Sequence, residues 1–204
     1  MQPSAAMLSL VDAIASSEGV PPELLKALVE IESAWDPKAY RAEPQIHDAS
    51  YGLAQILYGT AKSIGYQGTP EGLFIPAEGL KWGARYLRRM LNTFQGNWVL
   101  AMAGYNAGPG NARKAITRSG SRDPEKIDPF LPSITRSYWK KALVWARHYA
   151  GQISRAEAII QAKAGEVTQE LLEFAKSPTG KTTGFLLLMI VILGAAMMGG
   201  RNAG

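Results

Sequence analysis

The chain has 204 residues, of which 47% are hydrophobic and 19% charged, a balance typical of one globular domain with some additional chain. It contains no cysteine, which excludes a disulfide framework and a thiolate metal site. Its two histidines, His47 and His148, lie far apart in the sequence, so we expect no zinc site and no cofactor. The net charge of +5 favours anionic surroundings, but no phosphate-binding loop or aromatic-basic motif predicts a specific nucleic-acid site.

Helical patterns cover most of the chain before residue 153. Ser4 and Asn97 are candidate caps, because their side chains can accept hydrogen bonds from the first free N–H groups of a helix. Pro22 and Pro76 suit the first turns of two further helices, where no backbone N–H is needed. No run alternates convincingly as a strand, and we interpret the polar stretch 38–50 as a loop. The predicted fold class is therefore all-α, with its main helices over residues 4–17, 22–35, 53–64, 76–94, 97–108 and 134–152.

The C-terminal part of the chain differs in character. Residues 153–180 keep a helical pattern in which charges separate the apolar residues, and we interpret them as an amphipathic linker. Residues 182–200 follow without a charge. As a helix they would be about 28 Å long, close to the hydrocarbon core of a bilayer at roughly 30 Å. We therefore predict a transmembrane segment, the alternative being a buried core helix. The predicted domains are 1–152, 153–180 and 181–204.

Glu32 is the most informative residue, because it lies within the apolar face of its predicted helix. At about 100° per residue it falls with Leu28 and Trp35, whereas Lys26 and Glu30 fall on the opposite face and can form an i, i+4 pair. Glutamate is rarely buried unless it is paired. One explanation is catalytic, since apolar surroundings raise the pKa of a carboxyl and let it act as a general acid near neutral pH. The alternative is a glutamate near the helix end whose side chain reaches water.

Three later segments carry polar residues in patterns that are specific only when they are taken together. Residues 50–56 read Ser-Tyr-Gly-Leu-Ala-Gln-Ile, residues 103–110 read Ala-Gly-Tyr-Asn-Ala-Gly-Pro-Gly, and residues 135–138 read Thr-Arg-Ser-Tyr. Singly, they fit a helix start, a glycine helix stop and a packing tyrosine. Together, and following the Glu-Ser-Ala-Trp of residues 32–35, they resemble the SLT-type lytic transglycosylases, family 23 of the glycoside hydrolases. That family shares a lysozyme-like fold with goose-type lysozymes, and the resemblance covers roughly residues 10 to 150.

The resemblance implies cleavage of the β-1,4 bond between MurNAc and GlcNAc in peptidoglycan. Glu32 would protonate the glycosidic oxygen and then act as base on the sugar's own 6-hydroxyl, which closes a 1,6-anhydro-muramyl ring without consuming water. Assistance by the substrate's N-acetyl oxygen would remove the need for a second carboxylate. Tyr138 would contact the carboxylate or the intermediate. The residues implied to orient or bind the substrate are Ser33, Gln55, Tyr105, Asn106 and Tyr138.

Two departures from the family pattern leave the outcome of the reaction open. Ala54 stands where the family often has methionine, so we expect a less filled pocket floor. The stretch between Glu32 and Gln55 is also longer than in the common pattern and closer to goose-type lysozymes, where acidic loop residues can position water. Asp48 in this stretch would then support hydrolysis, and a hydrolysing muramidase is the alternative function. The other interpretation of Asp48 is a loop aspartate that caps the helix predicted from residue 53.

The predicted tail bears on the location and partners of the protein. We recognise no secretory signal at the N-terminus, so a C-terminal anchor would normally leave the domain away from the wall. One resolution is a phage virion protein that assists genome entry; the alternative is an enzyme of the bacterial inner membrane or periplasm. Expected partners are peptidoglycan strands, lipid along residues 182–200, and virion proteins or a second copy through the C-terminal helix. A non-catalytic, membrane-anchored wall-binding or pore-lining protein is the remaining alternative.

Overall fold

The computed structural model describes the backbone of residues 2–176 and the side chains of residues 2–165. The chain divides into two compact units after Ala158, and helix α9 (Arg155–Lys176) begins in the first unit and continues in the second. Within the described residues, no helix is long and apolar enough to span a bilayer. The predicted span, residues 182–200, lies outside that part of the chain. The predicted domain boundaries stay predictions.

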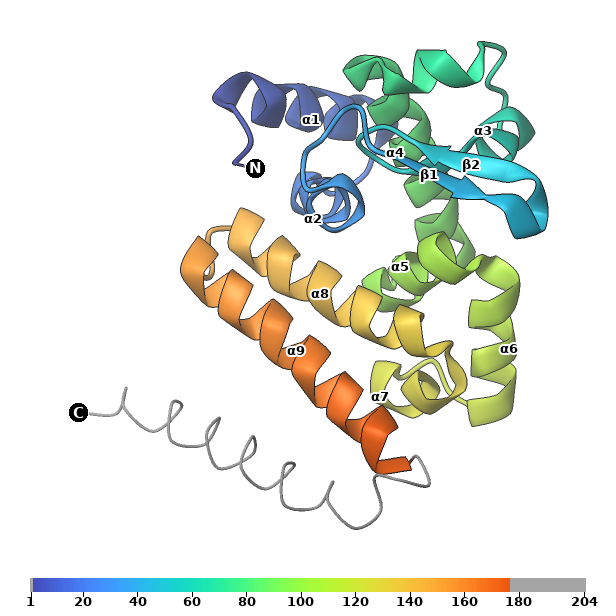
Figure 1. Ribbon diagram of the computed structural model, residues 1–204, viewed down its shortest axis with the longest axis vertical. Coiled ribbons are helices and arrows are strands. Elements are labelled where there is room, and N and C mark those ends of the chain that lie inside the picture. Colours follow the sequence, from blue (N-terminus) through green and yellow to red (C-terminus); the bar gives the residue numbers. More distant parts are fainter. Residues whose placement is uncertain (1, 177–204) are drawn as a thin grey trace. The chain divides into compact units, whose positions relative to one another are not determined.

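The first unit is mainly helical, with a small antiparallel sheet that follows α2 in the sequence (Figure 1). The sheet contains β1 (Tyr40–Glu43), β2 (Asp48–Tyr51) and β3 (Ile56–Leu57) in the order β1-β2-β3. Short 3₁₀ turns cover Pro44–Ile46, Pro70–Phe74 and Asp128–Phe130. The helices are α1 (Ala5–Glu18), α2 (Pro22–Ser33), α3 (Tyr58–Ser63), α4 (Pro76–Thr93), α5 (Trp98–Ala107), α6 (Pro109–Ser119), α7 (Pro124–Ile127) and α8 (Ser133–Tyr149).

The helix starts follow the local chemistry that the sequence predicted. The Ser4 hydroxyl accepts a hydrogen bond from Met7 N at 3.2 Å, and Asn97 Oδ1 accepts one from Leu100 N at 3.0 Å. Both predicted caps are therefore confirmed. Proline occupies the first turn of α2 and of α4, as expected from its fixed φ and missing N–H.

The sheet shows that the all-α prediction was wrong between residues 40 and 57. The first three residues of β1 are exposed, and its sequence, Tyr-Arg-Ala-Glu, lacks the alternation of apolar and polar residues by which a half-buried strand is recognised. The register pairs Arg41 with Ser50 and holds β1 against β2 as a hairpin. The helix predicted from residue 53 begins only at Tyr58, because Gly52 and Gln55 adopt left-handed φ values of +65° and +44°.

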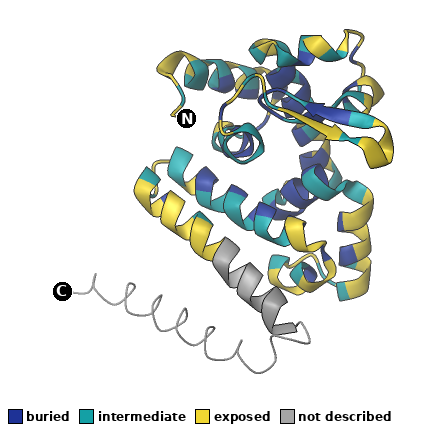
Figure 2. Ribbon diagram, viewed as in Figure 1, coloured by how far each residue is buried: buried dark blue, intermediate teal, exposed yellow. Residues whose placement is uncertain are grey.

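The hydrophobic core is built around α5, whose residues 99–105 are all buried. Helices α4 and α8 pack against α5, and α2 packs most extensively against α8. Figure 2 shows buried residues along α5 and the inward faces of its neighbours, while α6 and the far end of the β1–β2 hairpin are largely exposed. This packing places the last turn of α2, the hairpin, the end of α5 and the start of α8 around one cleft.

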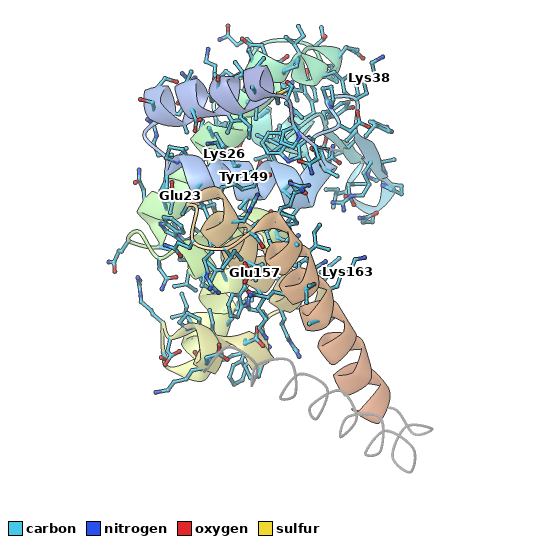
Figure 3. The ribbon with its side chains drawn as sticks, turned by 90° about the vertical axis from the view of Figure 1, so that its left-hand side faces the viewer. Glu23, Lys26, Lys38, Tyr149, Glu157 and Lys163 are labelled. Atoms are coloured by element: carbon cyan, nitrogen blue, oxygen red, sulfur yellow. The ribbon has the colours of Figure 1, made fainter. Side chains whose placement is uncertain are left out.

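The side of α2 opposite Glu32 differs from its prediction. Lys26 pairs with Asp12 of α1 at 2.6 Å, so the expected pair with Glu30 does not form. The Glu30 carboxylate instead accepts hydrogen bonds from the Tyr149 hydroxyl at 2.6 Å and from Arg155 Nη2 at 2.9 Å. Figure 3 shows Tyr149 beside α2. Trp35 Nε1 also donates to Glu30 Oε2 at 2.5 Å. A helical wheel misses this network, because two of its members come from the far end of α8 and the start of α9.

Candidate active site

A cleft of about 670 Å³ lies where α2, the hairpin, α5 and α8 meet. Glu32 lines it from the last turn of α2, and Gln55 lines it from the loop before β3. Tyr105 and Asn106 line it from the end of α5. These four predicted site residues, which are up to 74 positions apart in the sequence, are thus brought to one place.

A short hydrogen bond from α8 orients the Glu32 carboxyl. The Tyr138 hydroxyl in α8 donates to Glu32 Oε1 at 2.6 Å. Burial raises the pKa of Glu32 to about 7, and the bond from Tyr138 and the positive charge of Arg41 only partly oppose that rise. Near neutral pH this carboxyl therefore has access to both its acid and its base form, as general acid–base catalysis requires.

Tyr105 forms part of the floor of the cleft, and its hydroxyl bonds to the backbone rather than to Glu32. Its hydroxyl donates to the Ala54 carbonyl at 2.9 Å, and its ring packs against Tyr86 at 5.1 Å between centroids. Burial, together with the negative charge of Glu32, raises the pKa of Tyr105 well above its usual value, so the phenol stays protonated.

The floor beneath Tyr105 is closely packed despite the small side chain of Ala54. Ala54 is fully buried, and a Cβ placed on Gly83 of α4 would lie 2.3 Å from the Ala54 Cβ. Because glycine has no side chain, Gly83 lets α4 approach the loop that contains Ala54. The expectation of a less filled floor was wrong at this point, because the helix itself occupies the space.

Gln55 is fixed by its own loop. Its Nε2 donates to the Ala39 carbonyl at 2.9 Å and to the Gly52 carbonyl at 3.0 Å. These bonds hold the loop in its left-handed turn and leave the amide oxygen as the acceptor that Gln55 can offer to a ligand in the cleft.

Asn106 is positioned by a residue that the sequence-based assignment did not include. The Thr135 hydroxyl donates to Asn106 Oδ1 at 2.8 Å, and Thr135 is fully buried and lines the cleft. With its oxygen bonded to Thr135, Asn106 has its NH₂ group to offer as a donor. Thr135 opens the Thr-Arg-Ser-Tyr segment, so its position in that motif was an available signal.

Three predicted residues, Ser33, Asp48 and Tyr138, are not among the residues that line the cleft, and Tyr138 reaches the site only through its hydrogen bond to Glu32. The Ser33 hydroxyl donates to the Val29 carbonyl within α2 at 3.1 Å. Asp48 accepts from Gly59 N at 2.9 Å and from Ala49 N at 2.8 Å, and Gly59 lies in the first turn of α3. This geometry favours the helix-capping interpretation of Asp48 over a role in positioning water.

The hairpin also places two charged side chains along the cleft. Arg41 and Glu43 both line the cleft, and Arg41 Nε lies 2.6 Å from Glu43 Oε1. Among the residues that the structure describes, no group of three or more acidic or histidine side chains is arranged to hold a metal ion.

Comparison with known proteins identifies the family that carries this arrangement. Residues 9–127 match the transglycosylase SLT domain. The chain belongs to this family. The predicted family resemblance is therefore confirmed, and so is the mostly helical, lysozyme-like fold.

Individual relatives of this SLT-domain chain are much longer proteins. The soluble lytic murein transglycosylase of Escherichia coli K12 is 32% identical over 142 residues, which are 66% of this chain and 21% of the relative. The membrane-bound lytic murein transglycosylase F of Aeromonas salmonicida is 26% identical over 141 residues, covering 63% and 26% of the two chains. The chain thus spans about a fifth to a quarter of the length of these relatives.

Solved structures show the same relationship. A lytic transglycosylase Slt from Pseudomonas aeruginosa, solved as an inactive mutant, matches with a TM-score of 0.63 and 27% identity over 71% of this chain and 24% of that one. The 70-kDa soluble lytic transglycosylase of Escherichia coli matches with a TM-score of 0.61 and 31% identity, over 70% of this chain and 24% of that one. The family match over residues 9–127 includes the cleft residues Glu32, Gln55, Tyr105 and Asn106.

Proposed function

We propose that this SLT-domain chain is a peptidoglycan lytic transglycosylase, which cleaves the β-1,4 bond between MurNAc and GlcNAc and leaves a 1,6-anhydro-muramyl end. The observation that carries the proposal is the state of Glu32, a carboxyl with a pKa of about 7 that lines the cleft and is bonded to Tyr138. Such a group can donate a proton to a leaving oxygen near neutral pH and then accept one.

The reaction uses one carboxyl twice. Protonated Glu32 donates to the glycosidic oxygen as the bond to the anomeric carbon breaks, and the substrate's N-acetyl oxygen bonds to that carbon. The Glu32 carboxylate then takes the proton of the muramyl 6-hydroxyl, whose oxygen attacks the anomeric carbon and releases the N-acetyl oxygen. The ring closes, Glu32 is protonated again, and no water is consumed.

The absence of a suitably free second carboxylate along the described cleft supports this scheme. Besides Glu32, the acidic residue that lines the cleft is Glu43, and its carboxylate is paired with Arg41. Asp48 is bonded to the start of α3. Glycosidases that use a separate nucleophile or base need a second, correctly spaced carboxylate. This arrangement favours the transglycosylase over the hydrolysing muramidase.

The neutral groups of the cleft suit an uncharged sugar with N-acetyl arms. In this proposal Gln55 accepts a hydrogen bond through its amide oxygen and Asn106 donates through its NH₂ group. Tyr138 holds the carboxyl, and Tyr105 shapes the floor. Ser33 contributes only through the last turn of α2, because its hydroxyl is bonded within the helix.

The proposal is consistent with the Pseudomonas aeruginosa relative, whose inactive mutant replaces one glutamate with glutamine. The corresponding experiment here is to measure soluble fragments released from purified peptidoglycan sacculi by the wild-type chain and by Glu32→Gln. We expect release by the wild type and none by the variant, with unchanged far-UV circular dichroism. Equal release by both would overturn the assignment of Glu32 and favour a different catalytic group.

We further propose that the chain acts at a membrane and is carried by a phage particle to assist genome entry. The uncharged stretch 182–200 supports the membrane part, since its length matches the hydrocarbon core of a bilayer. Membrane fractionation of the chain with and without residues 181–204 tests the membrane association, and a shortened chain that stays with the membrane would defeat it.

Proteomics of purified virions tests the association with a phage particle, and absence of the chain from virions would defeat it.

A further inference from the structure

Arg41 is the one basic residue among the described residues that line the cleft. It lies in β1 opposite Ser50, which lines the cleft from β2. Burial raises the pKa of Glu32, and the positive charge of Arg41, after the bond from Tyr138, partly opposes that rise. The Arg41 side chain is nevertheless 63% exposed, so it remains accessible to a ligand.

The pairing of Arg41 leaves part of its guanidinium available. The ion pair with Glu43 runs through Nε, at 2.6 Å from Glu43 Oε1. The edge formed by the two Nη atoms is therefore available to a planar carboxylate, which guanidinium groups bind with two parallel hydrogen bonds. The Arg41 end of this pair is exposed, whereas the Glu43 side chain is only 16% exposed. Ion pairs with a solvent-exposed partner contribute about 0–1 kcal/mol to stability, so stability alone is a weak reason for a cation at this place.

The remaining cleft groups favour an anionic arm on an otherwise neutral ligand. Gln55, Asn106 and Thr135 are uncharged, and Glu32 is largely protonated at slightly acidic pH. Glu43 is held on its other oxygen by Gln45 Nε2 at 2.7 Å, which keeps this carboxylate beside Arg41 as a competitor for an incoming anion.

We propose that Arg41 is a specificity-determining residue, which binds a carboxylate on the lactyl arm of a muramyl sugar and so distinguishes muramyl from N-acetylglucosamine residues in the cleft. This inference rests on the proposed function. The carboxylate has two sources with the same chemistry, the free lactyl group of peptide-free strands or a carboxylate of an attached stem peptide. Because charged and neutral sugars alternate along the strand, such a contact would set which β-1,4 bond lies against Glu32.

The experiment measures glycan binding by calorimetry at pH 6 in the Glu32→Gln background, where no turnover occurs. The ligands are peptide-free glycan oligomers, oligomers with intact stem peptides, and neutral chito-oligosaccharides of equal length. Adding Arg41→Gln should weaken binding of at least one carboxylate-bearing ligand about tenfold, equivalent to 1.4 kcal/mol, and leave the chito-oligosaccharide unchanged. Loss with peptide-free oligomers alone identifies the lactyl carboxylate, and loss with stem-bearing oligomers alone identifies the peptide.

Glu43→Gln separates recognition from hairpin structure. If Arg41 binds the ligand, removing its competitor should strengthen binding of the same carboxylate-bearing oligomer several-fold. If the ion pair only supports the hairpin, Glu43→Gln and Arg41→Gln should weaken binding of all three ligands alike, which would overturn the inference. Arg88→Gln, an equal change of charge on the exposed surface of α4, is the matched control and should alter nothing.

The outcomes also separate this inference from the function on which it rests. If the Glu32→Gln protein binds none of the three ligands, the proposed function fails. If it binds them and Arg41→Gln changes no affinity, the inference on Arg41 fails and the proposed function stands. Raising the salt concentration provides a further check, since the Arg41-dependent difference should shrink as the exposed charges are screened.

Discussion

The hydroxyl of Tyr138 donates to Glu32 Oε1 at 2.6 Å and thereby connects α8 to the last turn of α2 across 106 residues of sequence. The bond orients the carboxyl and stabilises its charged form, while burial acts in the opposite direction. The balance leaves the pKa of Glu32 at about 7, and several measurable consequences follow from disturbing it.

Tyr138→Phe should raise the pKa of Glu32. The lost hydrogen bond favoured the carboxylate, so its removal leaves burial less opposed, and the protonated acid persists to higher pH. The alkaline limb of the kcat/KM profile should move upward, while the rate below that limb falls because the carboxyl is less well oriented. A limb at unchanged or lower pH would contradict this role of Tyr138.

Arg41→Gln should move the same limb in the same direction, for a different reason. The positive charge of Arg41 lowers the pKa of Glu32 through space, so removing it also favours the protonated acid. Because Arg41 is exposed, the difference between the two proteins should decrease at high salt. The bond from Tyr138 is short and direct, so the effect of Tyr138→Phe should respond much less to salt.

Glu32→Gln should increase stability at alkaline pH. The folded-state pKa of Glu32 lies above its unfolded value of 4.5, so between pH 4.5 and about 7 the folded state binds more protons than the unfolded state. The free energy of unfolding of the wild type therefore falls through this window, by at most about 3 kcal/mol, and stays lower above it. The variant should lack that fall. Urea unfolding at pH 4.5 and pH 8 provides the comparison, and parallel changes in the two proteins would argue against a buried, titrating Glu32.

Glu30→Ala should decrease the stability of the fold, whereas Glu32→Gln should increase it at alkaline pH, although the two residues are only two positions apart. Glu30 accepts hydrogen bonds from Tyr149 and Arg155, and truncation would leave both without this partner. We expect a loss of about 3 kcal/mol at neutral pH, as for other broken buried pairs. The alkaline limb set by Glu32 should not move in the fraction that remains folded. A fully stable variant would show that water replaces the carboxylate in this network.

Gly83→Ala tests the close packing beneath the cleft. The added Cβ would lie 2.3 Å from the Ala54 Cβ, so α4 or the Gln55 loop has to shift. The expected cost is about 1–3 kcal/mol, together with lower activity because Tyr105 is bonded to the same loop. Gly110→Ala is the matched control, since a Cβ there meets nothing within 4 Å. Equal thermal unfolding midpoints in the two variants would refute the packing argument.

The sequence predicted the parts of this molecule that depend on local chemistry. Caps such as Ser4 and Asn97 are local, and the helical period placed Glu32 on an apolar face before any neighbour was known. The order of the four motifs then indicated the family, which the match over residues 9–127 confirms.

The features that the sequence did not predict depend on partners distant in the chain or on weak local signals. The hairpin has short, exposed strands without apolar alternation, so Arg41 and Glu43 were assigned to a loop. Glu30 was expected to pair with Lys26, but it accepts hydrogen bonds from Trp35, just after α2, and from Tyr149 of α8 and Arg155 of α9. Asp48 had two interpretations, and only the position of Gly59 favours one of them.

The central claim is that Glu32 serves as both acid and base without a water nucleophile. Its most direct test is mass spectrometry of the new glycan ends produced when the wild-type chain digests purified sacculi. The account predicts 1,6-anhydro-muramyl ends, lighter than reducing ends by one water, and no new ends with Glu32→Gln. Digestion that yields only reducing ends, or undiminished cleavage by Glu32→Gln, would contradict it.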